Sequence, residues 1–594
     1  MCGIIGIVSR PSGRAVPTTQ DIVALLDRAV ASIPDLTEAA IHVIDADRLL
    51  RGDAGIQCLA GNLELIAAMT SRLDRLDAFA ADEEQRIDAL HTDSASLDEQ
   101  VEQLSRLRDG LWALRRDRIR TANEVHALAG RSASVGALCG YLSIQQALSA
   151  IDRMEVRGRD SAGISVLVWA DNLADNADIT QGIRTRSNDP LFTNNSVRFN
   201  SKCLVFVYKA AAEIGELGDN TRAMRAAVKN DDLLRIALAL PGVRVTVLGH
   251  TRWASVGIIS EPNAHPVTGE EVDHASGHLS VAALNGDVDN HADLKMRYKL
   301  SFADPITTDA KVIPALVDRF RESTPQVVDA FRNAVTQFEG SVAIAYATAD
   351  RPDAMYLALH GSGQGMCIGL AEDRYVIASE PYGVVEETQH YIRMDGELLA
   401  DPSQPSSRGQ IVVLDAAHAG HLDGVDLLSY EGDTMALTSA DVHTAEVTTR
   451  DIDRGTAPHF LLKEISEAPS SFRKTLRGRI RDDNGYLVPD LDQSTLPESV
   501  IAKIRDGVIT RVRIIGQGTA AIAGRSMVTV LEALTGGQLQ IDAMTATELS
   551  GFAMYADMSD MLVVAVSQSG TTTDTNRTVD LVSGRGASVL AIVN

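Results

Sequence analysis

The chain opens with a short apolar run that has no candidate strand partner nearby. Gly3 to Val8 has the pattern of a buried strand, whereas residues 17–135 are rich in Ala, Leu, Asp and Arg and poor in strand formers. The backbone N–H and C=O groups of a buried strand need hydrogen-bond partners. The fold therefore has to close around an insertion to bring Cys2 next to Arg157.

Residues 17–135 carry helical periodicity. One run of residues follows a 3,4 spacing broken only by Glu83: Ile66, Met69, Leu73, Leu76, Ala80, Glu83, Ile87 and Leu90. A capping box at Ser96–Glu99 predicts the start of a second helix, which carries Leu97, Val101, Leu104, Leu107, Leu111 and Leu114. We expect an antiparallel, coiled-coil-like helical hairpin inserted into another domain. Its role is either that of a structural or oligomerising arm, or that of a regulatory or partner-docking element.

Cys2 directly follows the initiator Met. Removal of Met1 would give this residue both a thiol and a free α-amine, which titrates near ~8 and can take the proton from the thiol. The thiolate is the reactive form, and Gly3 leaves room beside it. The alternative is a chance cysteine at the start of a core strand. Cys139, also followed by Gly, is a rival nucleophile, but it has no free α-amine.

The composition is that of a globular protein with several cores. The chain has 594 residues, of which 45% are hydrophobic, and a net charge of -25 from 55 basic and 80 acidic side chains. This acidic balance argues against nucleic acid or an anionic membrane as a partner.

The cysteines and the apolar runs bear on the compartment. The five cysteines are scattered and form no CxxC pair, which favours a reducing compartment. No signal-like N-terminus and no run of 18 apolar residues is found. We therefore expect a cytoplasmic protein without a membrane segment.

Four further motifs follow the helical segment in a fixed order. They are the turn Arg157 to Gly163, the loop Gly249 to Gly257 with His-Thr-Arg-Trp-Ala, the Asn263-Ala264-His265-Pro266 segment, and Asn285-Gly286. Loops at strand ends are where a rigid scaffold presents binding groups. Together with the opening Cys-Gly-Ile, these motifs resemble the class II glutamine amidotransferase domain over residues 2–445. The resemblance implies an N-terminal-nucleophile hydrolase fold, a four-layer α/β/β/α sandwich.

The resemblance also implies roles for individual residues. Hydrolysis of a glutamine amide passes through an oxyanion, which Asn285 and the Gly286 N–H would stabilise. The α-carboxylate and α-ammonium of glutamine call for a forked cation and an anion, the roles of Arg252 and Asp309. Trp253 would gate the site. The full set implied to bind glutamine is Arg157, Arg252, Trp253, Ser255 and Asp309.

Each assignment has a purely structural alternative. In these alternatives Arg252 would pair with an acid at a domain interface, and Trp253 would belong to the core. Asn285-Gly286 would form a type I′ hairpin turn. Arg157 pairs with Asp160 inside its own turn.

The last part of the chain resembles a second family. Residues 446–457 suit a linker, and 458–594 resemble a sugar-isomerase (SIS) phosphosugar domain with a doubly wound α/β sheet. A hydroxyl-rich loop at a helix N-terminus favours a phosphate. The resemblance assigns the phosphate contacts to Thr519, Ser567, Gln568, Ser569 and Thr572. The alternatives are a linker helix after residue 458 and a dinucleotide fingerprint at Gly516-x-Gly518.

The sequence departs from these family patterns at several positions. Ser255 and Val256 replace Thr and His, Arg159 replaces an aromatic residue, Ala520 replaces a phosphate-binding Ser, and Thr571 replaces a Glu. The sequence stops just after an apolar strand at 588–593, before any covering helix and before a second SIS domain. We therefore expect a fragment, with the isomerising residues outside it.

The two resemblances together indicate the family of glutamine:fructose-6-phosphate amidotransferases, which serve amino-sugar synthesis. They imply glutamine and fructose 6-phosphate as substrates, no metal or other cofactor, and a homo-oligomer, most simply a dimer. Two alternatives remain: a glutaminase whose SIS segment senses a phosphosugar, and a non-catalytic regulatory homologue.

Overall fold

The computed structural model describes residues 2–88, 94–211, 216–274, 278–399, 408–476, 480–489, 495–568, 570 and 572–593. These residues form two compact units, one ending at Pro469 and one beginning at Ser470. The domain limits expected at residues 445 and 458 stay a prediction.

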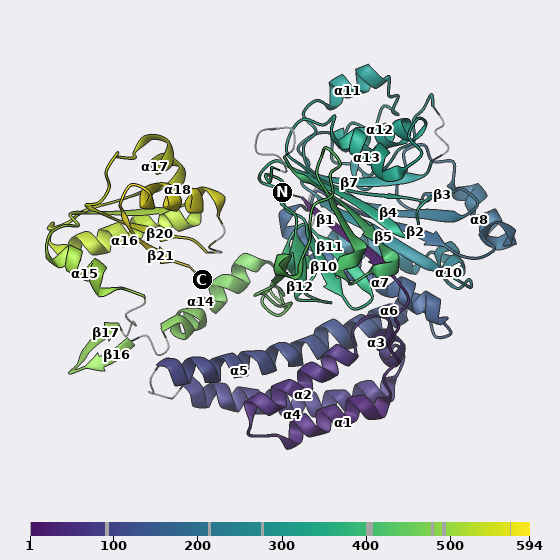
Figure 1. Ribbon diagram of the computed structural model, residues 1–594. Helices are drawn as coiled ribbons and strands as arrows, with labels where there is room; N and C mark the ends of the chain where they lie inside the picture. Colours follow the sequence, from purple (N-terminus) through teal and green to yellow (C-terminus); the bar gives the residue numbers. More distant parts are fainter. Residues whose placement is uncertain are drawn as a thin grey trace. The chain divides into compact units, whose positions relative to one another are not determined.

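The first unit contains two antiparallel sheets (Figure 1). The larger sheet has nine strands in the order β15 (Val442–Thr444), β12 (His390–Arg393), β10 (Cys367–Ala371), β11 (Arg374–Ala378), β1 (Gly3–Ser9), β5 (Arg244–Arg252), β2 (Ser161–Trp169), β4 (Cys203–Ala210) and β3 (Val197–Phe199). The opening strand β1 lies in the middle, with Gly3 opposite Thr251 and Ile5 opposite Ala378. Both partners of β1 thus come from beyond the helical segment.

The smaller sheet has six strands in the order β14 (Val425–Leu428), β13 (Gln410–Asp415), β9 (Ala354–His360), β8 (Val342–Thr348), β7 (Ser280–Gly286) and β6 (Val267–Thr268). Residues alternate between the two faces of a strand. Alternate residues of both sheets, such as Ile4, Leu248, Val281 and Ala345, therefore meet in one apolar core between the sheets.

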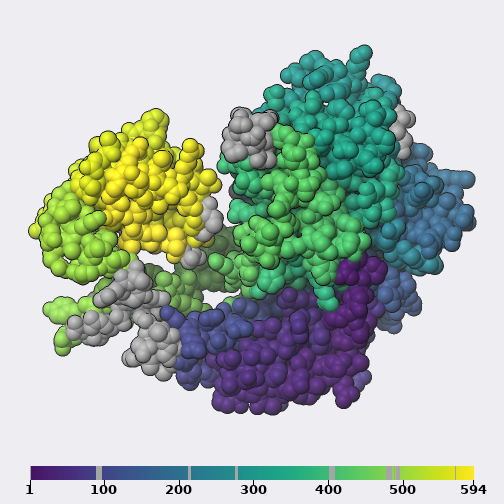
Figure 2. Space-filling view, viewed as in Figure 1, coloured from purple at the N-terminus to yellow at the C-terminus, as the bar shows by residue number. Residues whose placement is uncertain are grey.

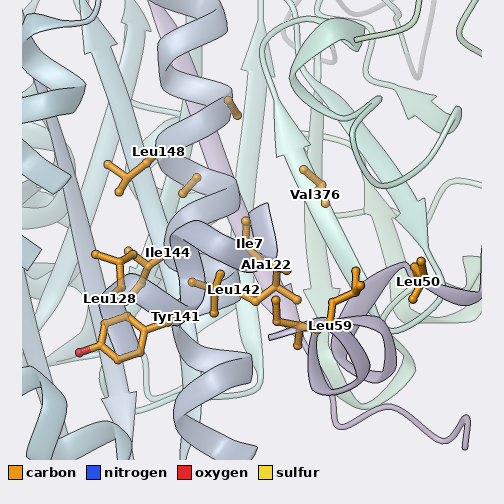
Figure 3. Close-up of a cluster of buried hydrophobic side chains, with 14 of the residues drawn as sticks. Ile7, Leu50, Leu59, Ala122, Leu128, Tyr141, Leu142, Ile144, Leu148 and Val376 are labelled. Atoms are coloured by element: carbon orange, nitrogen blue, oxygen red, sulfur yellow. The ribbon is translucent and has the colours of Figure 1, made fainter. Parts of the chain in front are cut away.

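Helices cover the outer face of each sheet. The outer face of the smaller sheet packs on α11 (His291–Tyr298), α12 (Val312–Arg321) and α13 (Val327–Val335). The outer face of the larger sheet packs on α7 (Val135–Met154), α8 (Ala177–Arg186), α9 (Asp219–Lys229), α10 (Asp232–Leu238) and the inserted helices. Figure 3 shows this core, where Ile7 and Val376 of the strands approach Leu142 of α7 and Leu59 of the insertion. The expected α/β/β/α sandwich is confirmed.

The insertion contains the expected hairpin and further helices. The hairpin helices are α4 (Leu63–Asp88) and α5 (Ser94–Trp112), and the turn between them lies outside the described residues. Before them come α1 (Thr19–Ala31), α2 (Leu36–Leu49) and α3 (Gly52–Leu59), and after them a π-helical stretch, η1 (Ala113–Arg120), and α6 (Thr121–Ala129). In Figure 2 this purple and blue bundle forms one continuous surface against the green sandwich.

The second unit is a parallel α/β sheet. Its strands lie in the order β19 (Gln540–Thr545), β18 (Arg511–Gly516), β20 (Met561–Val566) and β21 (Ser588–Ile592). Side chains of α16 (Thr519–Thr535) and α15 (Glu498–Arg505) pack on one face, and those of α17 (Ala546–Phe552) and α18 (Thr573–Ser583) on the other. This is the expected doubly wound arrangement. Helix α14 (Phe460–Leu476) and the hairpin β16 (Ile480–Asp483)–β17 (Tyr486–Pro489) precede it.

None of the described helices combines the length and the apolar character needed to cross a membrane.

Candidate active site

Cys2 lies at the head of β1, beside the end of β5. Its Sγ is 3.3 Å from the Trp253 backbone N–H, which donates to it, and 3.4 Å from the Trp253 carbonyl oxygen. Burial raises the pKa of the Cys2 thiol, although the Trp253 N–H and the charge of Arg252 act in the opposite direction. Because the thiol is not ionised by its surroundings, attack by Cys2 requires a base.

Asn285 is held beside the opening strand by a buried hydrogen-bond network. Its Nδ2 donates to Ser379 Oγ at 2.7 Å, and its Oδ1 lies 3.1 Å from Nε2 of His250. Ser379 Oγ also accepts from the backbone N–H of Ile4 at 2.8 Å, two residues after Cys2. An amide nitrogen has two N–H groups. The second N–H of Asn285 has no partner among the described residues, so it can donate to an oxyanion.

Gly286 occupies a position that no other residue fits. Its φ is +85°, and an added Cβ would lie 1.9 Å from the carbonyl oxygen of Ser341. Asn285 and Gly286 end strand β7, opposite Ala343 and Val342 of β8. They therefore do not form the two-residue hairpin turn that was an alternative interpretation.

Arg252 and Asp309 are both buried near Cys2, with exposed fractions of 3% and 4%. Arg252 donates through Nη1 to the Ile258 carbonyl at 3.3 Å and through Nη2 to that of Val256. Burial lowers the pKa of Arg252, and the charges of Cys2 and Asp309 act in the opposite direction. Among the described residues Arg252 has no ion-pair partner, which removes the alternative of a structural salt bridge.

Asp309 begins the short 3-10 turn η5 (Asp309–Lys311) before α12. Its Oδ2 accepts from the Val288 N–H at 2.8 Å. Burial raises the pKa of its carboxyl, and the nearby Asp287 adds to that effect. A ligand ammonium group would relieve this repulsion.

Trp253 and Ser255 lie on the loop that follows β5. Trp253 is 59% exposed, so it is not a core residue. Ser255 Oγ donates to Asp287, whose charge in turn raises the pKa of both Cys2 and Asp309. Asp287 directly follows Asn285-Gly286, but its role was not predicted from the sequence.

The Arg157 turn braces this loop. Arg157 pairs with Glu380, not with Asp160. Asp160 accepts from the Ala254 N–H at 2.8 Å and donates its own N–H to the Arg252 carbonyl at 3.1 Å. Gly158 lies so close that an added Cβ would be 2.6 Å from the Arg252 carbonyl carbon. The turn that carries Arg157 thus supports the loop through Asp160 and Gly158, and a contact of Arg157 with glutamine stays a prediction.

Two further residues of the network around Asn285, His250 and Ser379, were not predicted from the sequence to take part in the site. His250 and Ser379 position Asn285, and His265 packs on His250 with ring centroids 4.5 Å apart. Their motifs are visible in the sequence, but nothing there shows that segments 94 residues apart meet.

Cys139 does not share these surroundings. It lies in α7, where burial and the neighbouring Asp53 carboxylate raise the pKa of its thiol strongly. This environment disfavours the thiolate that a nucleophile needs.

A second candidate site lies at the carboxyl edge of the parallel sheet in the second unit. The chain leaves β18 for β19 on one side and later returns to β20 on the other, so neighbouring loops diverge between β18 and β20. Ligands of open α/β sheets bind at such a switch point. The loops that follow these two strands carry Thr519 and the segment from Ser567 to Thr572.

The residues of the second site are placed as follows. Thr519 and Thr572 lie at the N-terminal ends of α16 and α18, and neither helix has a side-chain cap. Ser567 Oγ accepts from the Gly570 N–H at 3.1 Å and lies 3.4 Å from Thr572 Oγ1. Gln568 is exposed, as is the Thr519 side chain. Ser569 and Thr571 lie outside the described residues.

Within the described part of the chain, no group of three or more His, Cys, Asp or Glu side chains is arranged to hold a metal ion.

The chain is similar to two curated bacterial proteins named glutamine–fructose-6-phosphate aminotransferase (isomerizing). The one from Streptococcus pneumoniae is 26% identical over 75% of this chain and 59% of its own length. The one from Geobacillus kaustophilus is 27% identical over 77% of this chain and 62% of its own length. The expected resemblance is thus confirmed, and the chain spans about 60% of the length of these relatives.

No protein-family model matches the chain. One solved structure with a similar course is glutamine phosphoribosylpyrophosphate amidotransferase from B. subtilis, in complex with ADP and GMP. It is 15% identical, covers 76% of this chain and 79% of its own, and superposes with a TM-score of 0.32.

Proposed function

We propose that this chain hydrolyses glutamine at Cys2 and passes the ammonia to fructose 6-phosphate, as part of a glutamine–fructose-6-phosphate aminotransferase that makes glucosamine 6-phosphate. The observation that carries the proposal is the arrangement of an N-terminal thiol, a held amide and a buried Arg–Asp pair around one loop. The names of the relatives supply the acceptor and the product.

The chemistry follows from the residues. The α-amine of processed Cys2 takes the thiol proton, and Sγ attacks the side-chain carbonyl carbon of glutamine. Asn285 Nδ2 and the Gly286 N–H stabilise the oxyanion. Collapse of the tetrahedral intermediate breaks the C–N bond, and the protonated α-amine of Cys2 gives its proton to the departing nitrogen. Ammonia is released, and the glutamyl thioester that remains on Cys2 is hydrolysed by water.

Recognition of the substrate uses the charged pair. The Arg252 guanidinium binds the α-carboxylate as a forked donor, and Asp309 binds the α-ammonium. Ser255 and Trp253 lie on the connecting loop, where the exposed indole covers the mouth of the site. In this proposal Arg157, which also pairs with Glu380, completes the glutamine-binding set.

The sugar phosphate binds in the second unit. Thr519, Ser567, Gln568, Ser569 and Thr572 supply hydroxyl, amide and backbone donors at two helix N-termini. The presence of this second site is what favours a transferase over a simple glutaminase.

Cleavage of glutamine is tested on the full-length protein with and without fructose 6-phosphate. Glucosamine 6-phosphate should form, and Cys2→Ala should abolish it. Glutamine hydrolysis that responds to fructose 6-phosphate without that product would instead identify a phosphosugar-sensing glutaminase. Absence of any glutamine turnover by protein with Met1 removed would identify a non-catalytic homologue.

A further inference from the structure

A polar cavity lies inside the first unit, away from the residues of the candidate active site. Its volume is about 90 Å³, enough for several waters or one small molecule. Its walls come from the end of α5, the stretch η1, helix α6, the last two turns of α7, helix α9, Leu217, residues 449–454 and Phe460. Four guanidinium groups line it: Arg120, Arg153, Arg225 and Arg454.

Two of these arginines have N–H groups without a hydrogen-bond partner among the described residues. Arg120 uses only its Nε, which donates to the Arg116 carbonyl at 3.1 Å, so both Nη groups have no hydrogen-bond partner among the described residues. Arg153 pairs through Nη1 with Glu386 at 2.6 Å, while its Nε is buried without a partner. The Arg153 Nε is the buried donor of the two, and because a buried donor without a partner is costly, an acceptor from a ligand or an ordered water is expected there.

The same cavity contains one unpartnered acceptor. Asp117 is 3% exposed, and its Oδ2 accepts from Thr449 Oγ1 at 2.6 Å. Its Oδ1 is buried and has no partner. Burial, together with the nearby Glu386 charge, raises the pKa of the Asp117 carboxyl to about 7. Near neutral pH this group can therefore accept a hydrogen bond or donate one.

The other acidic groups in the wall already have partners. Glu124 lies 3.8 Å from Arg225 and accepts from Gln145. Asp152 accepts from Thr221 at 2.9 Å, and Asp453 accepts from the Gly455 N–H at 2.5 Å. Each of these three carboxylates thus has a hydrogen-bond or ion-pair partner, whereas Asp117 Oδ1 and Arg153 Nε have none among the described residues.

We propose that this cavity binds a phosphate group, either inorganic phosphate or the end of a small phosphate monoester. Phosphate oxygens accept several N–H groups at once and match the forked geometry of arginine. Inorganic phosphate also carries a hydroxyl near neutral pH, which donates to Asp117 Oδ1; with a monoester dianion, protonated Asp117 donates instead. Asp117 and Arg120 lie on the π-helical stretch η1, and such stretches occur frequently at functional sites.

The test uses Trp112, which lines the cavity and is one of three tryptophans. The full chain is labelled with 5-fluorotryptophan and titrated with sodium phosphate, with glycerol 3-phosphate, and with sodium sulfate at matched ionic strength. The fluorine resonance of Trp112, assigned through Trp112→Phe, should shift saturably with phosphate. At pH 8, above the pKa of Asp117, sulfate has no proton to donate to the ionised carboxylate and should bind at least about tenfold more weakly than inorganic phosphate. Because the reporter is local, phosphate bound in the second unit does not contribute to the shift.

Two variants and a matched control complete the test. Arg120→Gln and Arg454→Gln should each weaken phosphate binding at least about tenfold, and far-UV circular dichroism checks that each folds. Arg116→Gln, four residues before Arg120 and outside the cavity wall, should stay within about twofold. The tighter of phosphate and glycerol 3-phosphate identifies the natural source of the group.

Three outcomes would overturn the proposal. The first is that neither phosphate compound shifts the fluorine resonance of Trp112 saturably. This includes the case in which glycine, an amino acid without a phosphate group, produces the shift instead. The second is equal binding of sulfate and inorganic phosphate at pH 8, which would exclude a role of ionised Asp117 as acceptor. The third is an equal loss of binding in Arg116→Gln and Arg120→Gln, which would indicate unspecific charge attraction.

Discussion

At the scale of single residues, the Ser379 hydroxyl connects the nucleophile strand with the oxyanion amide. It accepts from the Ile4 N–H and from Asn285 Nδ2, and it is 2% exposed. A buried donor left without a partner costs roughly 1–3 kcal/mol. Ser379 is thus a positioning residue in the proposed reaction, because it acts through Asn285.

Ser379→Ala tests this positioning role. We expect kcat for glutamine hydrolysis to fall about tenfold or more with little change in KM, because the oxyanion donor loses its orientation. Unfolding free energy should fall by about 1–3 kcal/mol. Steady-state kinetics and urea unfolding measure both. Ser323→Ala, on an exposed hydroxyl, is the control; an unchanged kcat in Ser379→Ala would contradict the role.

His250 gives a pH-dependent stability with a definite sign. It is fully buried, and burial together with the Arg252 charge lowers its pKa from 6.5 to about 3. The folded state therefore excludes a proton that the unfolded chain binds below pH 6.5. The stabilising contribution is complete above that pH and is lost as the pH falls toward 3.

The expected slope from His250 alone is about 1.4 kcal/mol per pH unit below the unfolded pKa. In His250→Leu this part of the slope should disappear between about pH 6.5 and 5. Urea unfolding at several pH values measures it, with His421→Leu at an exposed position as control. An identical slope in wild type and His250→Leu would show that His250 is not excluded from protonation.

At the scale of elements, buried ion pairs fasten the inserted helices to the sandwich. Arg118 of η1 lies 2.8 Å from Asp47 of α2 and 2.8 Å from Glu387, which follows β11 in the chain. All three side chains are 3% exposed. Arg374 of β11 makes a similar connection to Asp53 of α3. The insertion is therefore part of the first unit and not a loosely attached arm.

Arg118→Met should destabilise the first unit by about 3–5 kcal/mol, because it leaves the buried Glu387 carboxylate without its cation and Asp47 with Arg51 alone. Arg115→Met on the same stretch, where Arg115 is 30% exposed and pairs with Asp74 and Asp77, should cost less than about 1 kcal/mol. Denaturant unfolding followed by circular dichroism compares them. Similar losses in the two variants would mean that burial of the Arg118 pairs has little energetic weight.

At the scale of the whole molecule, the two candidate sites belong to different compact units with separate cores. The Cys2 site depends on contacts between two antiparallel sheets. The candidate sugar-phosphate site in the second unit depends on two loops of one parallel sheet. Binding at the second site should therefore not require the Cys2 thiol.

Calorimetry of fructose 6-phosphate binding tests this separation. Cys2→Ala should keep the affinity within about twofold, whereas Ser567→Ala should weaken it about tenfold through loss of a phosphate contact. The unlabelled wild-type chain is the reference. Weakening of equal size in both variants would contradict two independent sites.

Much of this molecule can be predicted from local patterns. The apolar run Gly3–Ser9, the 3,4 spacing in α4 and α5 and the alternation of β18 and α16 all have periods set by backbone geometry, and each appears in the structure. The motif residues Cys2, Arg252, Asn285 and Asp309 also come from sequence, because amide hydrolysis and amino-acid recognition need those chemical groups. The helices α1–α3 were not separated in advance, since short helices in an Ala-rich segment have no distinct boundary signal.

Contacts between distant segments were decided only by the tertiary structure. That Ser379 joins Ile4 to Asn285, that Arg157 pairs with Glu380, and that Arg120 faces a cavity beside Asp117 depends on which segments pack together. The sequence by itself determined the periodic elements and the reactive residue types, because both are local properties of the chain. Burial, pKa shifts and hydrogen-bond partners are properties of the packed interior. They are decided only when the two sheets pack on each other and the inserted helices pack on the larger sheet.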